Sequence, residues 1–252
     1  MSQVEKARQF AALHRRGAPV VLYNIWDAGG AQAVVAGGAP AVATGSWSVA
    51  GAQGYPDGEA LPLDLLLSVV GRICASVDVP VSVDFEGAYA TAPEAAARNV
   101  ARVIGTGAIG INFEDRVVQG DGLHDTGAQA ARIRAIRAMA DDAGVPLFIN
   151  ARTDLFLQST PAAHGAHIAE ALERAAAYAQ AGASGFFVPG LADPALVARV
   201  TDGVALPVNV MAQAADQIAG FAAQGVARVS FGPMPYRRYV AEMTRAQDAL
   251  QP

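Results

Sequence analysis

The chain has 252 residues, of which 52% are hydrophobic and 16% are charged, and its formal net charge is −5. This length suits one large α/β domain, and the composition predicts a substantial buried core and excludes intrinsic disorder. The acidic balance lacks the clustered Lys and Arg of a nucleic-acid-binding surface, so no nucleic-acid partner is expected.

Two residue counts exclude further classes of protein. Lys6 is the only lysine, so a Schiff-base or pyridoxal enzyme would lack the buried lysine that it needs. Cys74 is the only cysteine, which excludes an intramolecular disulfide and a thiolate zinc cluster. The N-terminus has no signal-peptide pattern, and no apolar run reaches the roughly 18 residues of a membrane span. A cytoplasmic protein without a membrane partner is therefore expected.

In chain order, residues 3–15 have the pattern of an amphipathic helix, and short apolar segments then alternate with alanine-rich helical ones. The expected strands are residues 20–25, 41–47, 79–86, 108–115, 146–153, 184–189, 207–211 and 227–232. The expected helices that follow them are residues 28–36, 63–76, 93–105, 126–143, 162–181, 194–201, 214–224 and 236–250.

Eight strand–helix units in 252 residues predict a (β/α)8 barrel of the TIM type. An open doubly wound sheet is the alternative, but the segment after the first expected strand lacks the glycine spacing of a dinucleotide-binding turn. No linker divides the chain, so we expect one domain. Its parts are an N-terminal helix in residues 1–17, a barrel in residues 18–235 and a C-terminal helix in residues 236–252.

Polar residues gather at the carboxyl ends of the expected strands, where (β/α)8 enzymes place their active sites. The third strand ends with Asp84 and Glu86, which should point the same way because strand side chains alternate. Two carboxylates aimed at one place favour a hard divalent cation such as Mg²⁺ between them. The two longest connections, residues 47–61 and 116–125, leave from the same end, as functional loops do.

Five short segments in this order are similar to those of the isocitrate lyase/phosphoenolpyruvate mutase superfamily. They are Asn24-x-Trp26-Asp27, the Gly-Tyr-Pro-Asp57-Gly loop, Asp84-x-Glu86-Gly-x-Tyr89, Asn112-x-Glu114-Asp115 and Asn150-Ala-Arg152-Thr153-Asp154. The resemblance spans about residues 20–232. It implies an α/β barrel that forms homodimers or homotetramers, often with the last helix swapped. It also implies Mg²⁺ or Mn²⁺, and a small 2-oxo acid or dicarboxylate whose C–C or P–C bond is broken or formed through an enolate.

The resemblance also implies a metal site. By position, Asp84 matches the direct metal ligand. Glu86, Glu114 and Asp57 match ligands that act largely through metal-bound waters, which suits an ion that keeps several waters and takes one or two direct carboxylates.

Substrate-binding roles follow in the same way. Arg152 resembles the arginine that contacts the anionic groups of the substrate, and Ser46 and Trp47, with their backbone amides, resemble the pocket for the substrate carboxylate. Asn209 is expected to be a pocket amide. Tyr89, which follows the metal-binding strand, is expected to stack on the substrate or donate to it.

The chain departs from the family pattern in the loop of residues 116–125. This loop lacks the cysteine of the isocitrate and methylisocitrate lyases and the Lys and Asn of the mutases, and Pro189 stands where the mutases carry a histidine. His124 is the one histidine in the loop, either solvated or placed to act as an acid or base. The expected catalytic residues are therefore Asp57, Arg152 and His124.

Three functions remain open at this point. The first is a Mg²⁺-dependent lyase-type enzyme that cleaves or decarboxylates a small 2-oxo carboxylate through a metal-stabilised enolate, which needs the least beyond the metal site. The second is P–C bond chemistry, as a phosphonopyruvate mutase or hydrolase. The third is a non-catalytic 2-oxo acid binding protein that has kept the metal site.

Overall fold

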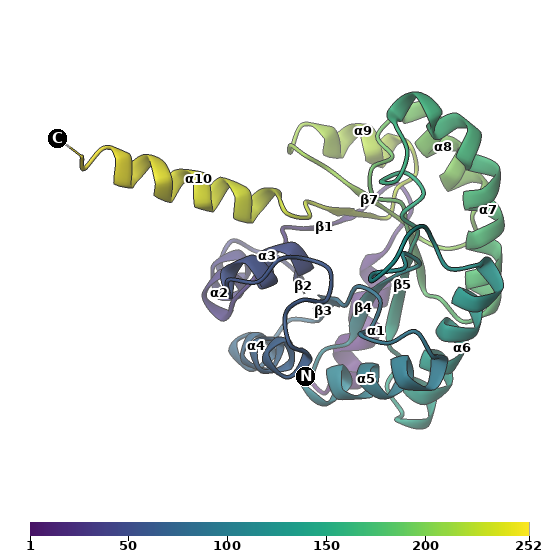
Figure 1. Ribbon diagram of the computed structural model, residues 1–252, viewed down its shortest axis with the longest axis horizontal. Coiled ribbons are helices and arrows are strands. Elements are labelled where there is room, and N and C mark those ends of the chain that lie inside the picture. The colour runs from purple at the N-terminus through teal and green to yellow at the C-terminus, as the bar shows by residue number, and fades with distance from the viewer. Residues whose placement is uncertain (252) are drawn as a thin grey trace.

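A closed barrel of parallel strands forms the centre of the molecule (Figure 1). The computed structural model describes residues 1–251, within which eight strands form one sheet in the order β1-β8-β7-β6-β5-β4-β3-β2. The ring closes at a parallel bridge between Ile25 and Thr44, where the N–H of Ile25 donates to the carbonyl of Ala43 at 2.9 Å. The predicted (β/α)8 barrel is confirmed. The strands are β1 (Val20–Leu22), β2 (Val42–Ala43), β3 (Val81–Asp84), β4 (Gly110–Glu114), β5 (Phe148–Arg152), β6 (Gly185–Phe187), β7 (Val208–Met211) and β8 (Arg228–Ser230).

Helices surround the barrel because each strand is buried on both faces and must be covered on the outside. Val83, Ile111 and Ile149 face this layer and are fully buried in one core with the apolar sides of the helices. The helices are α1 (Gln3–Leu13), α2 (Ala28–Ala36), α3 (Ser46–Ala52), α4 (Leu63–Ser76), α5 (Pro93–Gly105), α6 (Thr126–Asp142), α7 (His164–Gln180), α8 (Pro194–Gly203), α9 (Gln217–Ala223) and α10 (Met234–Asp248), with a 3₁₀ turn η1 (Pro161–Ala163) before α7.

The amino-terminal end of the barrel is closed by α1. Ser2 caps this helix in a capping box with Glu5, which fixes where it begins. Phe10 of α1 packs on Phe148, at the start of β5, with a ring-centroid distance of 5.3 Å. Together with Val20 and other residues of the strand starts they form a separate apolar cluster. This end is therefore plugged, and access to the barrel is from the carboxyl end of the strands.

All eight expected strands are longer than the observed ones, and two of these differences involve candidate site residues. Residues 45–47 do not continue the second strand, because the chain turns after Thr44 and α3 begins at Ser46. Residues 85–86 do not continue the third strand, because β3 ends at Asp84 and a turn follows. Both differences lie where the chain leaves the barrel, and they change how the site residues are oriented.

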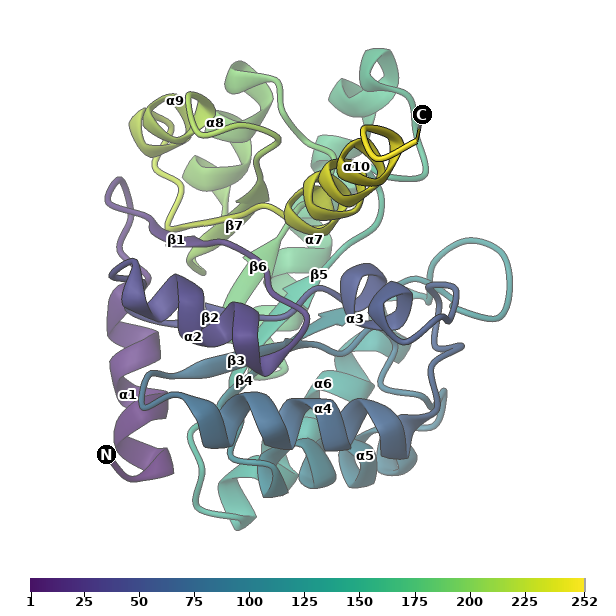
Figure 2. The same cartoon turned by 90° about the vertical axis from the view of Figure 1, so that its left-hand side faces the viewer.

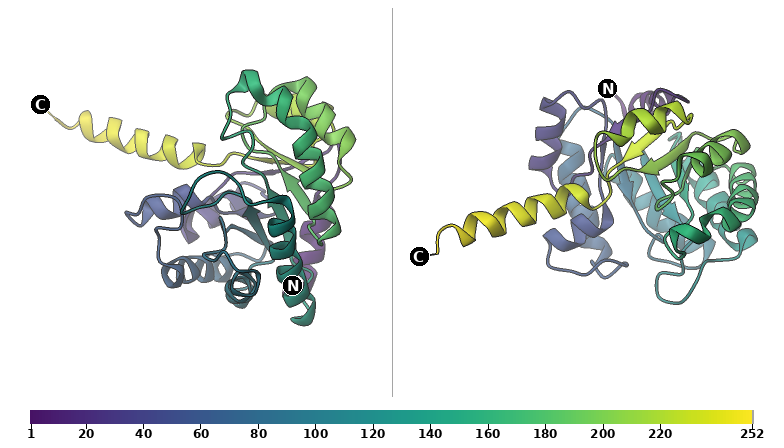
Figure 3. Two further views of the ribbon diagram at one scale, coloured as in Figure 1. Left: turned by 45° about the vertical axis from the view of Figure 1, so that its right-hand side comes forward. Right: turned by 90° about the horizontal axis from the view of Figure 1, so that it is seen from above.

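The last helix, α10, projects away from the barrel, as Figures 1 and 3 show. Its exposed apolar side chains include Tyr239, Val240 and Met243. A swap of this helix between partners in a homodimer or homotetramer stays a prediction. None of the helices in residues 1–251 combines the length and the apolar character that crossing a membrane requires.

Candidate active site

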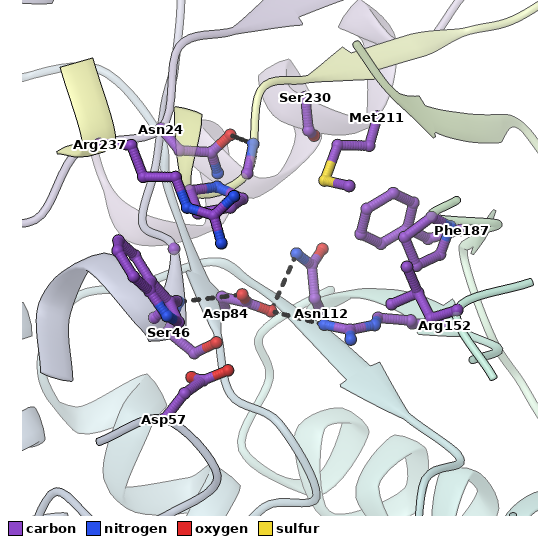
Figure 4. A pocket seen from close by; sticks show the side chains of 16 residues that line it. Asn24, Ser46, Asp57, Asp84, Asn112, Arg152, Phe187, Met211, Ser230 and Arg237 are labelled. Carbon is purple, nitrogen blue, oxygen red and sulfur yellow. Dashed lines mark hydrogen bonds and ion pairs between the residues drawn. The ribbon is translucent and has the colours of Figure 1, made fainter. Parts of the chain in front are cut away.

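A pocket of about 300 Å³ opens at the carboxyl end of the strands (Figure 4). This volume is at the small end of the range for ligand sites and suits a small molecule. One part of its wall is polar, with Ser46, Asp57 and Asp84, and another part is apolar, with Phe187 and Met211. The remaining lining residues are Asn24, Gly45, Trp47, Asn112, Arg152, Leu157, Pro189, Ser230, Gly232, Pro233 and Arg237.

Asp84 lies on the floor of this pocket and is held by three hydrogen bonds. Its Oδ2 accepts from the backbone N–H of Ser46 at 3.0 Å, and its Oδ1 accepts from Nδ2 of Asn112 at 3.2 Å. Its own N–H donates to Oγ1 of Thr44 at 2.9 Å. Asn112 is oriented in turn by Nδ2 of Asn150, which donates to its Oδ1 at 2.9 Å. The carboxylate therefore has a fixed orientation, set by the first residue of α3 and by Asn112 of β4, which Asn150 of β5 holds in place.

Arg152, at the end of β5, is surrounded by carboxylates. Its Nε and Nη2 donate to the two oxygens of Asp154 at 2.6 and 3.0 Å. Its Nη1 lies 2.9 Å from Oε2 of Glu114 and 4.0 Å from Oδ1 of Asp84. Burial lowers the pKa of Arg152, but these carboxylates outweigh it and the pKa is raised. Arg152 is therefore a fixed cation beside Asp84.

More carboxylates lie in and beside the pocket than the single positive charge of Arg152 can neutralise. Burial raises the pKa of Glu86 to about 9, and the charges of Asp57, Glu114 and Asp84 add to the effect. Burial also raises the pKa of Glu114, although Arg152 opposes it. The pKa of Asp57 is raised by burial and then by Asp84, against a side-chain hydrogen bond from Ser46. A cation placed among these groups would remove much of their repulsion.

Backbone strain is concentrated at the same place. The non-glycine residues with positive φ in residues 1–251 are Glu59, Glu86, Ala88 and Tyr89, at 59°, 48°, 62° and 54°. A left-handed conformation costs a non-glycine residue about 1–2 kcal/mol and persists where the surroundings impose it, often at functional sites. Glu86 is held there by the N–H of Glu59, which donates to its Oε2 at 3.0 Å.

The expected alternation of Asp84 and Glu86 along one strand is therefore wrong. Glu86 reaches the acidic cluster through a left-handed turn, and it lies beside the pocket and not in its lining.

The donor set suits a hard divalent cation, since its atoms are carboxylate and amide oxygens. In the described chain, residues 1–251, no three Asp, Glu, His or Cys side chains are close enough to hold one ion together. This arrangement fits one direct carboxylate, Asp84, with Asp57, Glu86 and Glu114 placed to orient waters around the ion.

The phosphoenolpyruvate phosphomutase family model matches residues 10–251. The chain belongs to this family. The resemblance of the five sequence segments to the isocitrate lyase/phosphoenolpyruvate mutase superfamily is thereby confirmed.

Related sequences and solved structures agree with this family assignment. An uncharacterized protein of Mycobacterium tuberculosis is 35% identical over 227 residues, which is 90% of this chain and 83% of the relative. Phosphoenolpyruvate phosphomutase of Streptomyces hygroscopicus is 34% identical over 184 residues, 70% of this chain and 56% of that enzyme. The crystal structure of a protein provisionally called a phosphonomutase, from Burkholderia cenocepacia J2315, is 45% identical with a TM-score of 0.95, covering 98% of this chain and 99% of the other.

Tyr89 and His124, two of the expected site residues, line a second cavity and not the pocket that holds Asp84. A second cavity of about 240 Å³ lies under the loop of residues 116–125 and is lined by Glu59, Tyr89, His124, Arg132 and other residues. The N–H of His124 donates to the carbonyl of Asp115 at 2.7 Å, and burial, followed by the charge of Arg132, lowers its pKa. The structure therefore does not bring Tyr89 and His124 into the pocket that holds Asp84.

Asn209 is a neighbour of a residue that lines the pocket. It is 1% exposed, and its Oδ1 accepts from Oγ of Ser230, a pocket residue, at 3.3 Å. Its Nδ2 has no partner among residues 1–251. Asn209 thus supports a lining residue and does not itself line the pocket.

The pocket also contains a cation that the sequence reasoning missed. Arg237, in the first turn of α10, lines it together with Trp47. The available signal was weak: two arginines, Arg237 and Arg238, follow the eighth strand within the expected C-terminal helix. Only the closing of the barrel brings this turn beside α3, where Trp47 contacts both Tyr236 and Arg237.

Proposed function

We propose that this family member is a Mg²⁺- or Mn²⁺-dependent enzyme that cleaves or decarboxylates a small 2-oxo carboxylate. The observation that carries the proposal is the fixed carboxylate of Asp84 on the pocket floor, 4.0 Å from Nη1 of Arg152 and surrounded by further acids. Phosphonopyruvate hydrolase, which shares this fold with a TM-score of 0.86 at 19% identity, has been crystallised with oxalate and Mg²⁺. Oxalate has the two adjacent oxygens of a 2-oxo acid.

In this proposal Asp84 holds the cation directly, and Asp57, Glu86 and Glu114 hold its waters. The bound cation would supply Lewis-acid stabilisation for negative charge on the substrate's keto oxygen.

Arg152 binds the substrate carboxylate. Asp154 and Glu114 fix its guanidinium before a ligand arrives, so little side-chain entropy is lost on binding. Its Nη1 remains the part of the group that faces Asp84. The backbone N–H of Ser46 donates to Asp84, and its hydroxyl forms a hydrogen bond with the carboxylate of Asp57. The apolar side of the pocket, Phe187 with Met211, limits water around the reacting bond.

P–C bond chemistry on phosphonopyruvate is the second candidate, because the family match is to phosphoenolpyruvate phosphomutase. The loop of residues 116–125 lacks lysine and asparagine, and Pro189 lines the pocket where a histidine would be expected for a mutase. These departures favour the C–C reaction.

Nuclear magnetic resonance distinguishes the reactions in one set of samples. Protein with Mg²⁺ is incubated with oxaloacetate or phosphonopyruvate, with a protein-free sample and Asp84→Asn protein as controls. In the oxaloacetate samples, pyruvate formed faster than in the controls supports decarboxylation, and acetate formed faster supports hydrolytic cleavage. Phosphoenolpyruvate or inorganic phosphate in the ³¹P spectrum supports the second candidate. Oxalate binding without turnover of either compound indicates a non-catalytic binder.

A further inference from the structure

The turn of residues 86–90, which follows β3, contains most of the backbone strain in the described chain. Three of the four non-glycine residues with positive φ in residues 1–251 lie in it: Glu86, Ala88 and Tyr89. The fourth, Glu59, exchanges two hydrogen bonds with this turn. A left-handed conformation is unfavourable for a residue with a Cβ, so the turn keeps its shape only while other contacts hold it. Those contacts therefore also decide where the carboxylate of Glu86 lies.

Arg132 of α6 holds this turn from outside the barrel. Its Nη2 donates to the carbonyls of Gly87 and Ala90, at 2.5 and 2.7 Å. These two carbonyls stand on either side of two of the left-handed residues. The side chain is 2% exposed, and its Cζ lies 4.6 Å from the centroid of the Phe113 ring of β4, a cation–π contact. One fixed guanidinium thus bonds to both halves of the turn.

The same guanidinium also reaches Glu114, the second acid beside Asp84. Nη1 of Arg132 donates to Oε1 of Gln129 at 2.6 Å, and Nε2 of Gln129 donates to the carbonyl of Glu114 at 2.9 Å. Both side chains are buried. The N–H of Glu114 in turn donates to the carbonyl of Glu86 at 3.0 Å. Arg132 is therefore connected to the backbone of both acids.

The contacts of Arg132 fix direction and do not neutralise its charge. Within residues 1–251 no carboxylate lies within 4 Å of its nitrogens, whereas the buried Arg174 pairs with Asp115 at 3.1 Å. The donors of Arg132 go to backbone carbonyls and to one amide, and the planar fork of a guanidinium sets the angle between such bonds.

We propose that Arg132 is a positioning residue of the metal centre, which holds Glu86 and Glu114 where they can orient the waters of the bound cation. It does not line the pocket and acts only through the turn and Gln129. Asn99 of α5 supports the same turn, since its Nδ2 donates to the carbonyl of Ala88 at 2.9 Å. Figure 2 shows α5 and α6 side by side outside β3 and β4. This inference rests on the proposed function, because it needs a cation at Asp84.

Two measurements test this role. Calorimetric titration with Mg²⁺ gives the Kd of the metal, and hydrogen–deuterium exchange without metal, followed by mass spectrometry, reports how firmly residues 86–90 are held. Arg132→Gln should weaken Mg²⁺ binding about 10- to 100-fold, the usual loss when a supporting residue of a metal site is removed, and should speed exchange in the turn. Arg132→Lys keeps a charged donor and should recover part of both losses.

The matched control is Arg137→Gln. Arg137 lies on the same helix and makes the same kind of contact, but at the amino end of the barrel. Its Nε donates to the carbonyl of Gly182 at 3.0 Å, and its Nη2 donates to that of Leu147 at 2.7 Å. This variant should lower stability to urea, as Arg132→Gln does, yet keep the Mg²⁺ Kd within about twofold of the wild type and leave exchange at residues 86–90 unchanged.

A Kd for folded Arg132→Gln within twofold of the wild type, or equal weakening by Arg137→Gln, overturns the role of Arg132. If Arg132→Gln does not fold, Asn99→Ala replaces it and should weaken Mg²⁺ binding about three- to tenfold with faster exchange in the turn. Faster exchange with an unchanged Kd, in either variant, shows that the turn does not set metal affinity and also overturns the proposal. Failure of the wild type to bind Mg²⁺ overturns the proposed function instead, whereas the exchange rates still show whether Arg132 holds the turn.

Discussion

The two ends of the barrel bury ionisable groups in opposite ways. At the carboxyl end, acidic side chains converge and burial raises their pKa values, that of Glu86 to about 9. At the amino end, burial lowers the pKa of His14 to about 3, with a further contribution from Arg228. Burial likewise lowers the pKa of Arg228 to about 10. The first group shares one sign and one location, so a single cation could neutralise it, whereas the second group has no common partner.

The amino end shows what isolated burial costs. Nε2 of His14 and both Nη atoms of Arg228 have no hydrogen-bond partner in residues 1–251. His14 instead stacks on Phe148 at a centroid distance of 4.1 Å. Buried polar atoms without partners each cost about 1–3 kcal/mol. This end is therefore closed by packing, whereas the acidic cluster that could bind a cation lies at the carboxyl end.

The largest expected effect on turnover comes from a substitution that removes one charge from the carboxyl end. Asp84→Asn keeps the shape of the side chain and should reduce turnover at least about 100-fold, because it removes the proposed direct ligand. Initial rates are measured on whichever of oxaloacetate or phosphonopyruvate the wild type consumes. Asp64→Asn, an exposed acid on α4, serves as the control and should change the rate less than about twofold. A rate for Asp84→Asn within threefold of the wild type would remove the metal site from the mechanism.

Acid should weaken the amino end selectively. The folded-state pKa of His14 is below the unfolded value of 6.5, so its contribution to stability is complete above pH 6.5 and falls as pH drops from 6.5 toward 3. Below pH 6.5 this loss approaches about 1.4 kcal/mol per pH unit, or about 3 kcal/mol by pH 4. Urea unfolding of the wild type and His14→Phe, compared as a function of pH, isolates this contribution. Parallel curves for the two proteins between pH 4 and 6.5 would contradict it.

Metal removal should weaken only the carboxyl end. At a Mg²⁺ concentration 100 times the Kd, binding to the folded state adds about 2.7 kcal/mol, which corresponds to a rise in Tm of about 5–10 °C for a chain of this size. Differential scanning calorimetry with Mg²⁺ or with EDTA measures this rise. Asp84→Asn should lose most of it, whereas His14→Phe should keep it. Equal Tm values for the wild type in Mg²⁺ and EDTA would contradict metal binding by the acidic cluster.

The smallest expected effect concerns the second cavity at the carboxyl end. His124→Gln should change turnover less than about threefold, because His124 lies outside the pocket that holds Asp84. Gln119→Ala, in the same loop and lining the same cavity, is the matched control. A loss of 100-fold or more for His124→Gln alone would mean that the loop closes and that His124 acts as the acid or base.

Sequence reasoning worked where local rules apply. The eight strand–helix units were predictable because apolar periodicity and turn residues repeat along the chain, and parallel strands need crossover helices. Asp84 and Arg152 end their strands on the inner side, so barrel topology alone placed them together. Ser46, Trp47 and Asp57 also line the pocket, although α3 replaces the expected strand end.

The sequence by itself thus determined the barrel, the family and the end at which polar residues gather, because these follow from local patterns repeated in a fixed order. Only the tertiary structure decided the direction of each side chain beyond the strand ends. Glu86 turns through a left-handed conformation, His124 and Tyr89 face a second cavity, and Arg237 reaches the pocket when the ring closes. Strand alternation stops where a strand stops, and from there contacts between residues far apart in the chain set the geometry.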